Sequence, residues 1–339
     1  MLSKRQLVRA TAVLLLGLVL INIAVVYLTR NSMPRRVMRH ARESQSATVL
    51  ALGNSLVAAA VDETAFASAA GLPVASDVAN LGLGGSAPLE QLLLFRYGIG
   101  HGMRPRLVLY GFYDFQLTSP FHFSTADLIG NHAMLYYVEP FYARRFYSLS
   151  LHDAFQFRVM RAVPMFADRG AIWAKVELMR RALGQQGLPV QRSNQFGRAG
   201  DFSFLESDNA EDFRRLCETS VALPLDRPVS ELLRQVRDAG MTVAVVQMPM
   251  RGTHRTMFYD TAWWAQYVAH LRNLLAPYGA IYVDASHWIE DDSLFTDPLH
   301  LSGQGAIQFS HRLGKLLGPE MTRLSVCPTT PSEARSSSP

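Results

Sequence analysis

The chain has 339 residues, of which 49% are hydrophobic and 18% charged, so a disordered chain and a coiled coil are excluded and a substantial core is expected. Its two cysteines, Cys217 and Cys327, are too few for a disulfide framework or a cysteine-rich zinc site. Residues 1–42 hold eight of the 33 basic residues and no acidic one, which leaves 25 basic against 28 acidic residues elsewhere. The net charge of +5 therefore does not indicate a nucleic-acid-binding face on the main domain.

Residues 1–30 are predicted to be an N-terminal membrane anchor. The apolar stretch across residues 10–29 carries no charge and, as a helix, is long enough to cross the ~30 Å of bilayer hydrocarbon. A cleaved signal peptide is the alternative, but the stretch is long and no small-x-small cleavage site follows it. Three basic residues precede the span and five follow it, so the charges alone favour a cytoplasmic location for the domain that follows.

Residues 31–46 are polar and basic and are predicted to be a short juxtamembrane linker, after which five apolar runs follow along the chain. Continuously apolar runs are typical of strands buried on both faces of a parallel sheet. Amphipathic helical patterns lie between them, as in residues 231–240 and 261–277. This alternation predicts a three-layer α/β/α fold with about five parallel strands. The runs cover residues 47–52, 74–81, 107–110, 242–246 and 280–283.

One segment, residues 115–227, is longer than a crossover between the third and fourth strands requires. We interpret it as a mostly helical insertion within a domain that covers residues 47–326, and its clearest helix is residues 171–183. The insertion is aromatic and partly basic. It either packs as a helical cap, or forms a lid that shapes a substrate pocket or leans on the bilayer. Residues 327–339 are rich in Pro, Ser and Thr and are expected to be a disordered tail.

Residues that can carry chemistry follow the ends of several predicted strands, where ligands bind in open α/β sheets. A serine, a glycine turn and an Asp/His pair are predicted to converge on this edge, and together they fit acyl transfer. Each motif alone is weak, because the serine can be a plain helix cap and the glycines a plain turn. The residues concerned are Gly53, Asn54, Ser55, Asn80, Gly82, Gly85, Tyr113, Asp114, Asp297 and His300.

The roles of these residues follow from the requirements of serine catalysis. Ser55, on a strand-to-helix turn, is the candidate nucleophile and needs a base, which His300 can supply. Asp297, three residues earlier, can hold the imidazole in the required tautomer. The backbone N–H groups of Ser55 and Gly85 are candidate oxyanion donors. The histidines show no metal-ligand spacing apart from this Asp/His pair, and we expect neither a metal nor a cofactor.

In this order, the motifs resemble those of the SGNH (GDSL-like) hydrolase superfamily. Gly53-Asn54-Ser55 is similar to the family's G-D-S block, the residues Asn80, Gly82 and Gly85 match its N-x-G-x-x-G block, and Asp297 and His300 match its D-x-x-H block. The resemblance covers roughly residues 47–114 and 228–318. It implies a flavodoxin-like α/β/α sheet, a Ser–Asp–His triad, and an oxyanion hole built partly from Gly85, with Asn80, Gly82 and Asn54 beside it.

The chain departs from the family at the third block, where the family has G-x-N-D and this sequence has Gly111-Phe112-Tyr113-Asp114. The carboxamide donor is missing, and Tyr113 is the candidate replacement in the oxyanion hole. Loss of one such donor typically costs ~10²–10³ in rate. In architecture the chain also resembles the membrane-anchored proteins of alginate O-acetylation and lipoteichoic acid D-alanylation.

The combined evidence predicts a membrane-anchored serine esterase or O-acyltransferase that acts on acyl, chiefly acetyl, esters of a cell-envelope glycan. We expect a single pass through the inner (plasma) membrane, a catalytic domain in the periplasm or outside the cell, and an acylated carbohydrate or other ester as substrate. An envelope polysaccharide-modification complex is a further candidate partner. The alternatives are a non-catalytic SGNH-like protein that binds a glycan or a partner, and a lipase or thioesterase.

Overall fold

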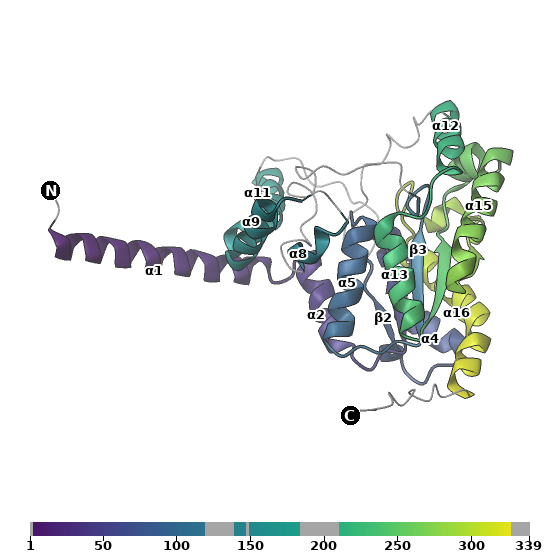
Figure 1. Ribbon diagram of the computed structural model, residues 1–339, viewed down its shortest axis with the longest axis horizontal. Coiled ribbons are helices and arrows are strands. Elements are labelled where there is room, and N and C mark those ends of the chain that lie inside the picture. Colours follow the sequence, from purple (N-terminus) through teal and green to yellow (C-terminus); the bar gives the residue numbers. More distant parts are fainter. Residues whose placement is uncertain (1–2, 119–138, 147–148, 184–209, 327–339) are drawn as a thin grey trace, which may run out of the picture.

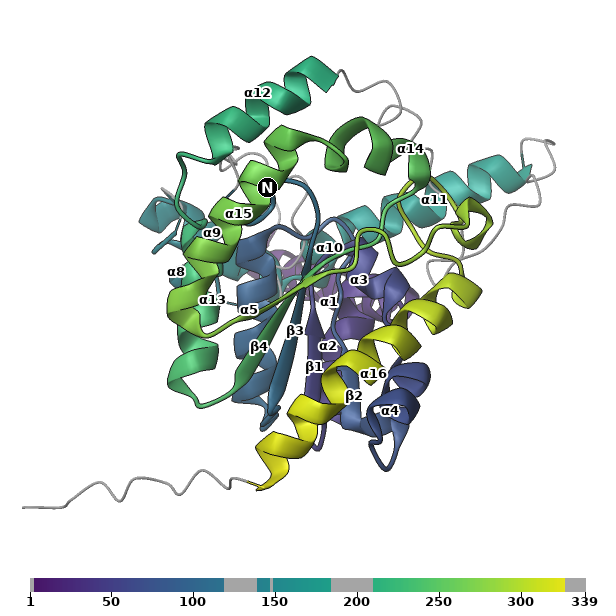
Figure 2. The ribbon, with the colours of Figure 1, turned by 90° about the vertical axis from the view of Figure 1, so that its right-hand side faces the viewer.

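The structure of the protein, a computed structural model, describes residues 3–118, 139–146, 149–183 and 210–326. At its centre is an all-parallel sheet with the strand order β2-β1-β3-β4-β5 (Figure 2). This confirms the predicted α/β fold, and each strand falls on one of the five apolar runs. The strands are β1 (Val49–Leu52), β2 (Val78–Asn80), β3 (Leu107–Phe112), β4 (Thr242–Gln247) and β5 (Ile281–Asp284).

Helices cover both faces of the sheet and account for the continuous hydrophobicity of its strands. α5 (Pro88–Gly100) packs against α13 (Arg227–Asp238) on one face, and α4 (Glu63–Ala70) against α16 (Gly303–Val326) on the other (Figures 1 and 2). Every residue of β1 and β3 is buried as a result. The remaining elements of this part are α14 (Gly252–His254), α15 (Ala262–Leu275), a π-helical turn (Arg255–Tyr259) and 3₁₀ turns at Ala75–Asp77, Ala276–Tyr278 and Asp292–Leu294.

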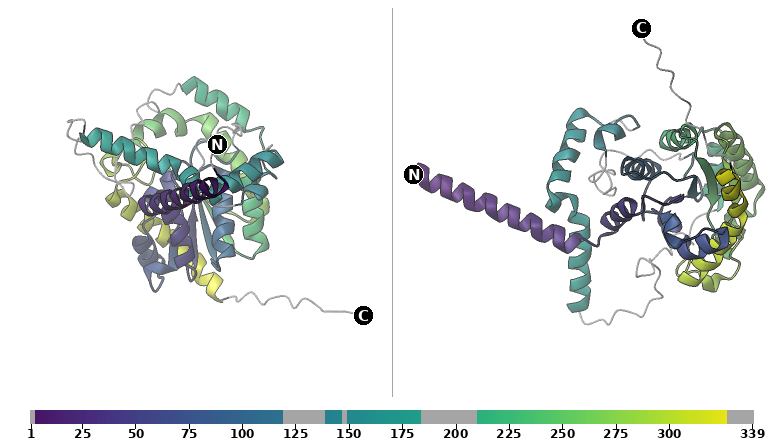
Figure 3. Two further views of the ribbon diagram at one scale, coloured as in Figure 1. Left: turned by 90° about the vertical axis from the view of Figure 1, so that its left-hand side faces the viewer. Right: turned by 90° about the horizontal axis from the view of Figure 1, so that it is seen from below.

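Helix α1 (Lys4–Thr29) projects away from this domain (Figures 1 and 3). It begins at a capping box, in which the Ser3 side chain accepts the backbone N–H of Gln6 and the Gln6 side chain accepts that of Ser3. Most of its apolar side chains are exposed. Among the described residues, α1 is the helix that is long and apolar enough to span a membrane.

Residues 31–46, which we expected to form a linker, are mostly helical. α2 (Met33–Glu43) has a proline in its first turn and packs against α5. Its basic residues lie on one side, whereas Val37 and Ala41 are buried in the core on the other. The domain thus begins directly after α1, and α2 ties that helix to the sheet.

The described part of the insertion between β3 and β4 is mostly helical. α10 and α11 contact α1. Residues 119–138, 184–209 and the tail at 327–339, with Cys327, lie outside the described residues. The helices are α8 (Pro140–Ala143), α9 (Leu151–Ala162), α10 (Pro164–Ala167), α11 (Arg169–Leu183) and α12 (Ala210–Ser220).

Helix α3 (Ser55–Ala60), which starts at the candidate nucleophile, approaches the surrounding backbone very closely. A Cβ atom at Gly82 would lie 2.3 Å from the backbone N of Ala58. A Cβ atom at Gly53 or Gly111 would lie 2.3 or 2.2 Å from Val57 Cγ2. Only glycine fits at these positions, so the glycines that the sequence placed at strand ends determine how close α3 lies to the sheet.

Replacing Gly82 with alanine tests this packing. We expect Gly82→Ala to lower the free energy of unfolding by about 1–3 kcal/mol, because its methyl group meets backbone rather than a side chain that can move. The control is Gly100→Ala at the end of α5, where a Cβ atom meets nothing within 4 Å. The control should be neutral or raise stability by up to ~1 kcal/mol. Urea unfolding of the detergent-solubilised chain measures both, and equal stability of the two variants would contradict the packing argument.

Candidate active site

Ser55 is the first residue of α3 and lies directly beyond the carboxyl end of β1. Asn54 caps the helix, since its Oδ1 accepts the backbone N–H of Leu56 at 2.9 Å and its Nδ2 donates to Gln116 Oε1 at 3.3 Å. The Ser55 side chain is half-buried, and its Oγ makes no hydrogen bond with the other described residues. Asn54 therefore orients the turn, and the hydroxyl of Ser55 remains available.

Asp297 and His300 form a buried pair, as the sequence predicted. His300 Nδ1 lies 2.9 Å from both carboxylate oxygens of Asp297, and their side chains are only 4% and 2% exposed. Asp297 Oδ1 also accepts the backbone N–H groups of Leu299 and His300, each at 2.9 Å. An antiparallel bridge between Phe295 and Leu301 closes the turn. The imidazole is thus held from its Nδ1 side, as in a histidine that acts through Nε2.

The surroundings of Asp297 favour its ionised form. Burial raises the pKa of its carboxyl group, but the hydrogen bond and charge of His300 and two backbone N–H groups outweigh burial and hold that pKa below its usual value. A carboxylate that stays ionised at neutral pH fixes the Nδ1–H tautomer of His300 and stabilises the imidazolium formed when Nε2 takes a proton.

Ser55, at the start of α3, and the Asp297–His300 turn, just before α16, lie at the same edge of the sheet. α16 follows the Asp297–His300 turn and packs on α3 and α4 (Figure 2). Buried Ser310 on α16 donates to the carbonyl of Ala60 at 2.9 Å and accepts the backbone N–H of Asp62 at 2.7 Å. The two predicted motifs therefore lie on or next to elements that pack against each other, whereas Ser55 Oγ and His300 are not hydrogen-bonded to each other, and their catalytic pairing stays a prediction.

Asn80 and Gly82 form the base of the glycine turn. Asn80 Nδ2 donates to the carbonyls of Val57 and Val61, at 3.2 and 2.8 Å, and its Oδ1 accepts the N–H of Gly82 at 2.9 Å. Asn80 thus caps the end of α3 and holds the turn. This is a positioning role, and a part for Asn80 and Gly82 in binding the oxyanion or the substrate stays a prediction.

Gly84 and Gly85 form the part of the turn nearest Ser55. A Cβ atom at Gly84 would lie 3.8 Å from Ser55 Cβ. Gly85 is exposed, has a φ of 71°, and faces open space in which a Cβ atom would meet nothing within 4 Å. The left-handed conformation favours glycine, and the open space leaves room for a substrate beside Ser55.

Tyr113 follows β3 at the same edge and is half-buried against the core. Its hydroxyl makes no hydrogen bond with another described residue. Burial and the charge of Asp114 raise the pKa of Tyr113 to about 12. The phenol therefore stays protonated at neutral pH and can donate a hydrogen bond, as an oxyanion donor must.

Asp114 belongs to a cluster that the sequence analysis missed. Its Oδ1 accepts hydrogen bonds from the hydroxyl of Tyr259 at 2.6 Å and from His254 Nε2 at 3.1 Å, and Tyr259 accepts the backbone N–H of Asp114 at 3.1 Å. These contacts hold Asp114 in the left-handed region, with φ 45°. A histidine shortly beyond the end of the fourth strand was the available signal, but its pairing with Asp114 spans 140 residues.

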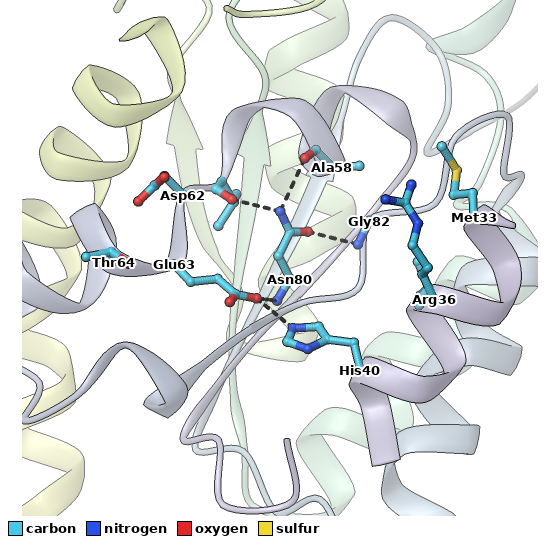
Figure 4. Close-up of a pocket in the computed structure, with 11 residues that line it drawn as sticks. Met33, Arg36, His40, Ala58, Asp62, Glu63, Thr64, Asn80 and Gly82 are labelled. Atoms are coloured by element: carbon cyan, nitrogen blue, oxygen red, sulfur yellow. Dashed lines mark hydrogen bonds and ion pairs between the residues drawn. The ribbon is translucent and has the colours of Figure 1, made fainter. Parts of the chain in front are cut away.

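A cavity of about 410 Å³ lies between α2 and α4, next to the end of α3 and to Asn80 (Figure 4). His40 points from α2 toward Glu63, with its Nε2 2.7 Å from Glu63 Oε1, and the same oxygen accepts the N–H of Asn80 at 2.7 Å. Met33 on α2 accepts the N–H of Gly84 through its sulfur, at 3.1 Å. α2 thus contacts one end of the glycine turn directly, through Met33, and the other end through Glu63.

Comparison with known proteins gives limited guidance. No protein-family model matches the chain, and no curated protein gives a significant match. Among solved structures, the chain is similar to one titled a "putative acylhydrolase" from Bacteroides fragilis NCTC 9343, with 11% identity, a TM-score of 0.36, and coverage of 80% of this chain and 86% of that one. A similarity at this level carries no argument about activity. Among the described residues, no group of three or more His, Cys, Asp or Glu is placed to hold a metal ion.

The His40–Glu63 contact predicts a pH-dependent stability. The hydrogen bond and charge of Glu63, opposed by burial, raise the pKa of His40 above its usual 6.5. A pKa raised by folding stabilises the folded state at pH values below the unfolded pKa, and this stabilisation is lost as the pH rises through the folded pKa. Wild type should therefore exceed His40→Gln in melting temperature at pH 6, and the difference should shrink by pH 9.

The control is His311→Gln on the exposed side of α16. Its difference from wild type should not change between the two pH values. Thermal unfolding by circular dichroism measures all three proteins, and a constant gap between wild type and His40→Gln from pH 6 to 9 would rule out the charged contact.

Proposed function

We propose that the protein is a membrane-anchored serine esterase or O-acyltransferase of SGNH type, acting on acetyl or other acyl esters of a cell-envelope glycan. The observation that carries this proposal is the buried Asp297–His300 pair. The pair directly precedes α16, and α16 is hydrogen-bonded to α3 through Ser310. The first residue of α3 is Ser55, which lies beside the open glycine turn. A serine, an oriented imidazole and exposed backbone donors at one edge are the components of acyl transfer through an acyl-serine.

In the proposed reaction, Ser55 Oγ attacks the ester carbonyl carbon while His300 Nε2 takes the hydroxyl proton. The carbonyl π electrons move to the oxygen, and the resulting oxyanion accepts hydrogen bonds from the N–H groups of Ser55 and Gly85 and the hydroxyl of Tyr113. The C–O bond to the leaving alcohol then breaks, and His300 returns the proton to that alcohol. Water or a sugar hydroxyl attacks the acyl-serine by the same steps in reverse.

Hydrolase and transferase differ only in the second acceptor, so the same residues serve both activities. Transfer requires that a sugar hydroxyl reaches the acyl-serine before water does. An acylated carbohydrate is thus the proposed substrate, and an envelope polysaccharide-modification complex the proposed setting. We further propose that α1 anchors the chain in the inner membrane, with the catalytic domain on the periplasmic or outer side, where such glycans lie.

A non-catalytic glycan-binding protein is the second candidate. The observation that favours it is Tyr113 in place of the family's asparagine. A binding protein would keep the surface at this edge of the sheet but would not need the hydroxyl of Ser55. The two candidates therefore differ in the consequence of losing that hydroxyl.

Removing the hydroxyl of Ser55 tests the nucleophile. We expect Ser55→Ala to lower the hydrolysis of p-nitrophenyl acetate by about 10³-fold or more, and His300→Ala to match it within about tenfold, because triad members act as a unit. The control is Ser68→Ala, an exposed serine on α4, which should retain full activity. Equal hydrolysis by wild type and Ser55→Ala would refute the assignment, and a wild type that hydrolyses no ester but still binds glycan would favour the second candidate.

Tyr113→Phe removes only the proposed third oxyanion donor. Because that contact is made in the transition state, kcat should fall by roughly tenfold or more while KM changes little. Tyr97→Phe on α5 is the matched control, and steady-state kinetics should show no change in either constant. If Tyr113→Phe also left the kinetics unchanged, the oxyanion hole would contain the backbone donors alone.

A further inference from the structure

The insertion helices α9 and α11 expose apolar side chains in regular stripes. Leu151, Phe155 and Val159 on α9 are spaced by four residues and are 65%, 61% and 46% exposed. Stripes at helical spacing normally face a core, yet this one and its counterpart on α11 face away from the domain. The counterpart consists of Trp173, Val176 and Met179, spaced by three residues.

These helices are docked on α1 at a defined depth. Asn22, a polar residue within the apolar stretch of α1, accepts the backbone N–H of Met165 at 3.0 Å and donates to the carbonyl of Leu18 at 2.8 Å. Met165 lies in α10, where its N–H has no partner within a helix turn of its own. In hydrocarbon an unpaired N–H group costs several kcal/mol, so Asn22 supplies the hydrogen bond that this position needs.

Further polar contacts join the insertion to the end of α1 that is nearer the domain. Asp168 accepts the hydroxyl of Thr29 at 2.9 Å and forms an ion pair with Arg35, and Lys175 donates to the carbonyl of Leu28. Asn22 precedes Leu28 by six residues, or about 9 Å along a helix. The contacts of the insertion with α1 thus change from mainly polar to mainly apolar over about 9 Å along that helix. This distance is similar to the depth of ~5–10 Å at which the apolar face of an interfacial helix is buried in a bilayer.

The arrangement in space agrees with this depth. α9 and α11 run across the direction of α1, near its C-terminal end (Figures 1 and 3). If α1 crosses the bilayer, helices in this orientation lie along the membrane surface. Exposed basic side chains, among them Arg158 and Lys175, accompany the apolar stripes, as in helices that bind anionic lipid surfaces.

A groove of about 660 Å³ separates α1 from the α9–α10 corner. This size lies within the range of about 300–1,000 Å³ of ligand sites. Its lining is apolar except for Asn22, both polar ends of which are already hydrogen-bonded. The lining residues are Leu15, Leu18, Val19, Asn22, Ile23, Val26, Ala162, Val163 and Pro164.

We infer that the α9–α11 segment is embedded in the membrane interface, and that the groove between this segment and α1 binds one acyl chain of a membrane phospholipid. This inference rests on the proposed insertion of α1 in the membrane and is independent of the catalytic assignment. An apolar groove continuous with a membrane-spanning surface meets lipid chains first, and it offers no unpaired polar group to a water-soluble ligand.

The four tryptophans of the chain make the interfacial placement of the α9–α11 segment directly testable, since Trp173 lies on α11 and the other three, Trp263, Trp264 and Trp288, lie in the domain. The full-length protein is reconstituted into phosphatidylcholine vesicles whose acyl chains carry bromine, a quencher of tryptophan fluorescence. We expect bromine near the headgroup to quench wild type, and Trp173→Phe to lose that quenching. Equal quenching of the two proteins would overturn the interfacial placement.

A tryptophan at Ile21 of α1, outside the groove lining, separates this inference from the anchor. Ile21→Trp in the Trp173→Phe background should be quenched by bromine deep in the acyl chains. A quenched Ile21→Trp with an unquenched Trp173 would overturn the interfacial placement of the α9–α11 segment and keep the anchor, whereas no quenching at either position would overturn both. Hydrolysis of p-nitrophenyl acetate by the same samples reports separately on the catalytic proposal.

The groove is tested by native mass spectrometry of the protein released from phosphatidylglycerol-containing membranes. We expect one phospholipid adduct on wild type and on Ile21→Trp, and its loss on Val163→Trp, which fills the groove. Retention of the adduct on Val163→Trp, or a wild type without any adduct, would overturn the acyl-chain site. Quenching of Trp173 in the Val163→Trp protein shows whether the α9–α11 segment is still docked.

Discussion

Helix α3 lies so close to the ends of β1 and β3 that glycine is needed at Gly53, Gly82 and Gly111 along its path. Asn80 secures the other end of the helix by donating to its last carbonyls. The position of Ser55 follows from this packing, because a six-residue helix held at both ends has little freedom to shift its first residue. The glycine turn is placed by the same contacts, so the candidate nucleophile and the candidate oxyanion donors share one support.

The candidate base, His300, lies in a different part of the chain, in the turn before α16. Ser310 ties α16 to both α3 and α4, and the Asp297–His300 turn lies immediately before α16. On the opposite side, α2 contacts the glycine turn directly through Met33, and His40 contacts Glu63, which accepts the N–H of Asn80. Because α2 follows α1 directly, the proposed membrane anchor and the proposed oxyanion loop are separated by one short helix.

The sequence predicted the parts of this structure that depend on local patterns. Five apolar runs were sufficient for the strands, and the residues that follow them led to Ser55, Asp297 and His300, whose catalytic roles stay a prediction. α2 was missed because its arginines mask two buried residues, Val37 and Ala41. The contacts of Asp114 with His254 and Tyr259, and of Asn22 with Met165, join residues more than 130 positions apart, and no local pattern encodes such pairs.

The central claim is that Ser55 forms a covalent bond to the acyl group while the glycine turn holds the oxyanion. The most direct measurement is the structure of the full-length protein after reaction with an alkyl fluorophosphonate. The account predicts phosphorus on Ser55 Oγ, with the phosphoryl oxygen at hydrogen-bond distance, about 2.7–3.1 Å, from the N–H groups of Ser55 and Gly85. An unmodified Ser55, or phosphorus on another side chain, would contradict it.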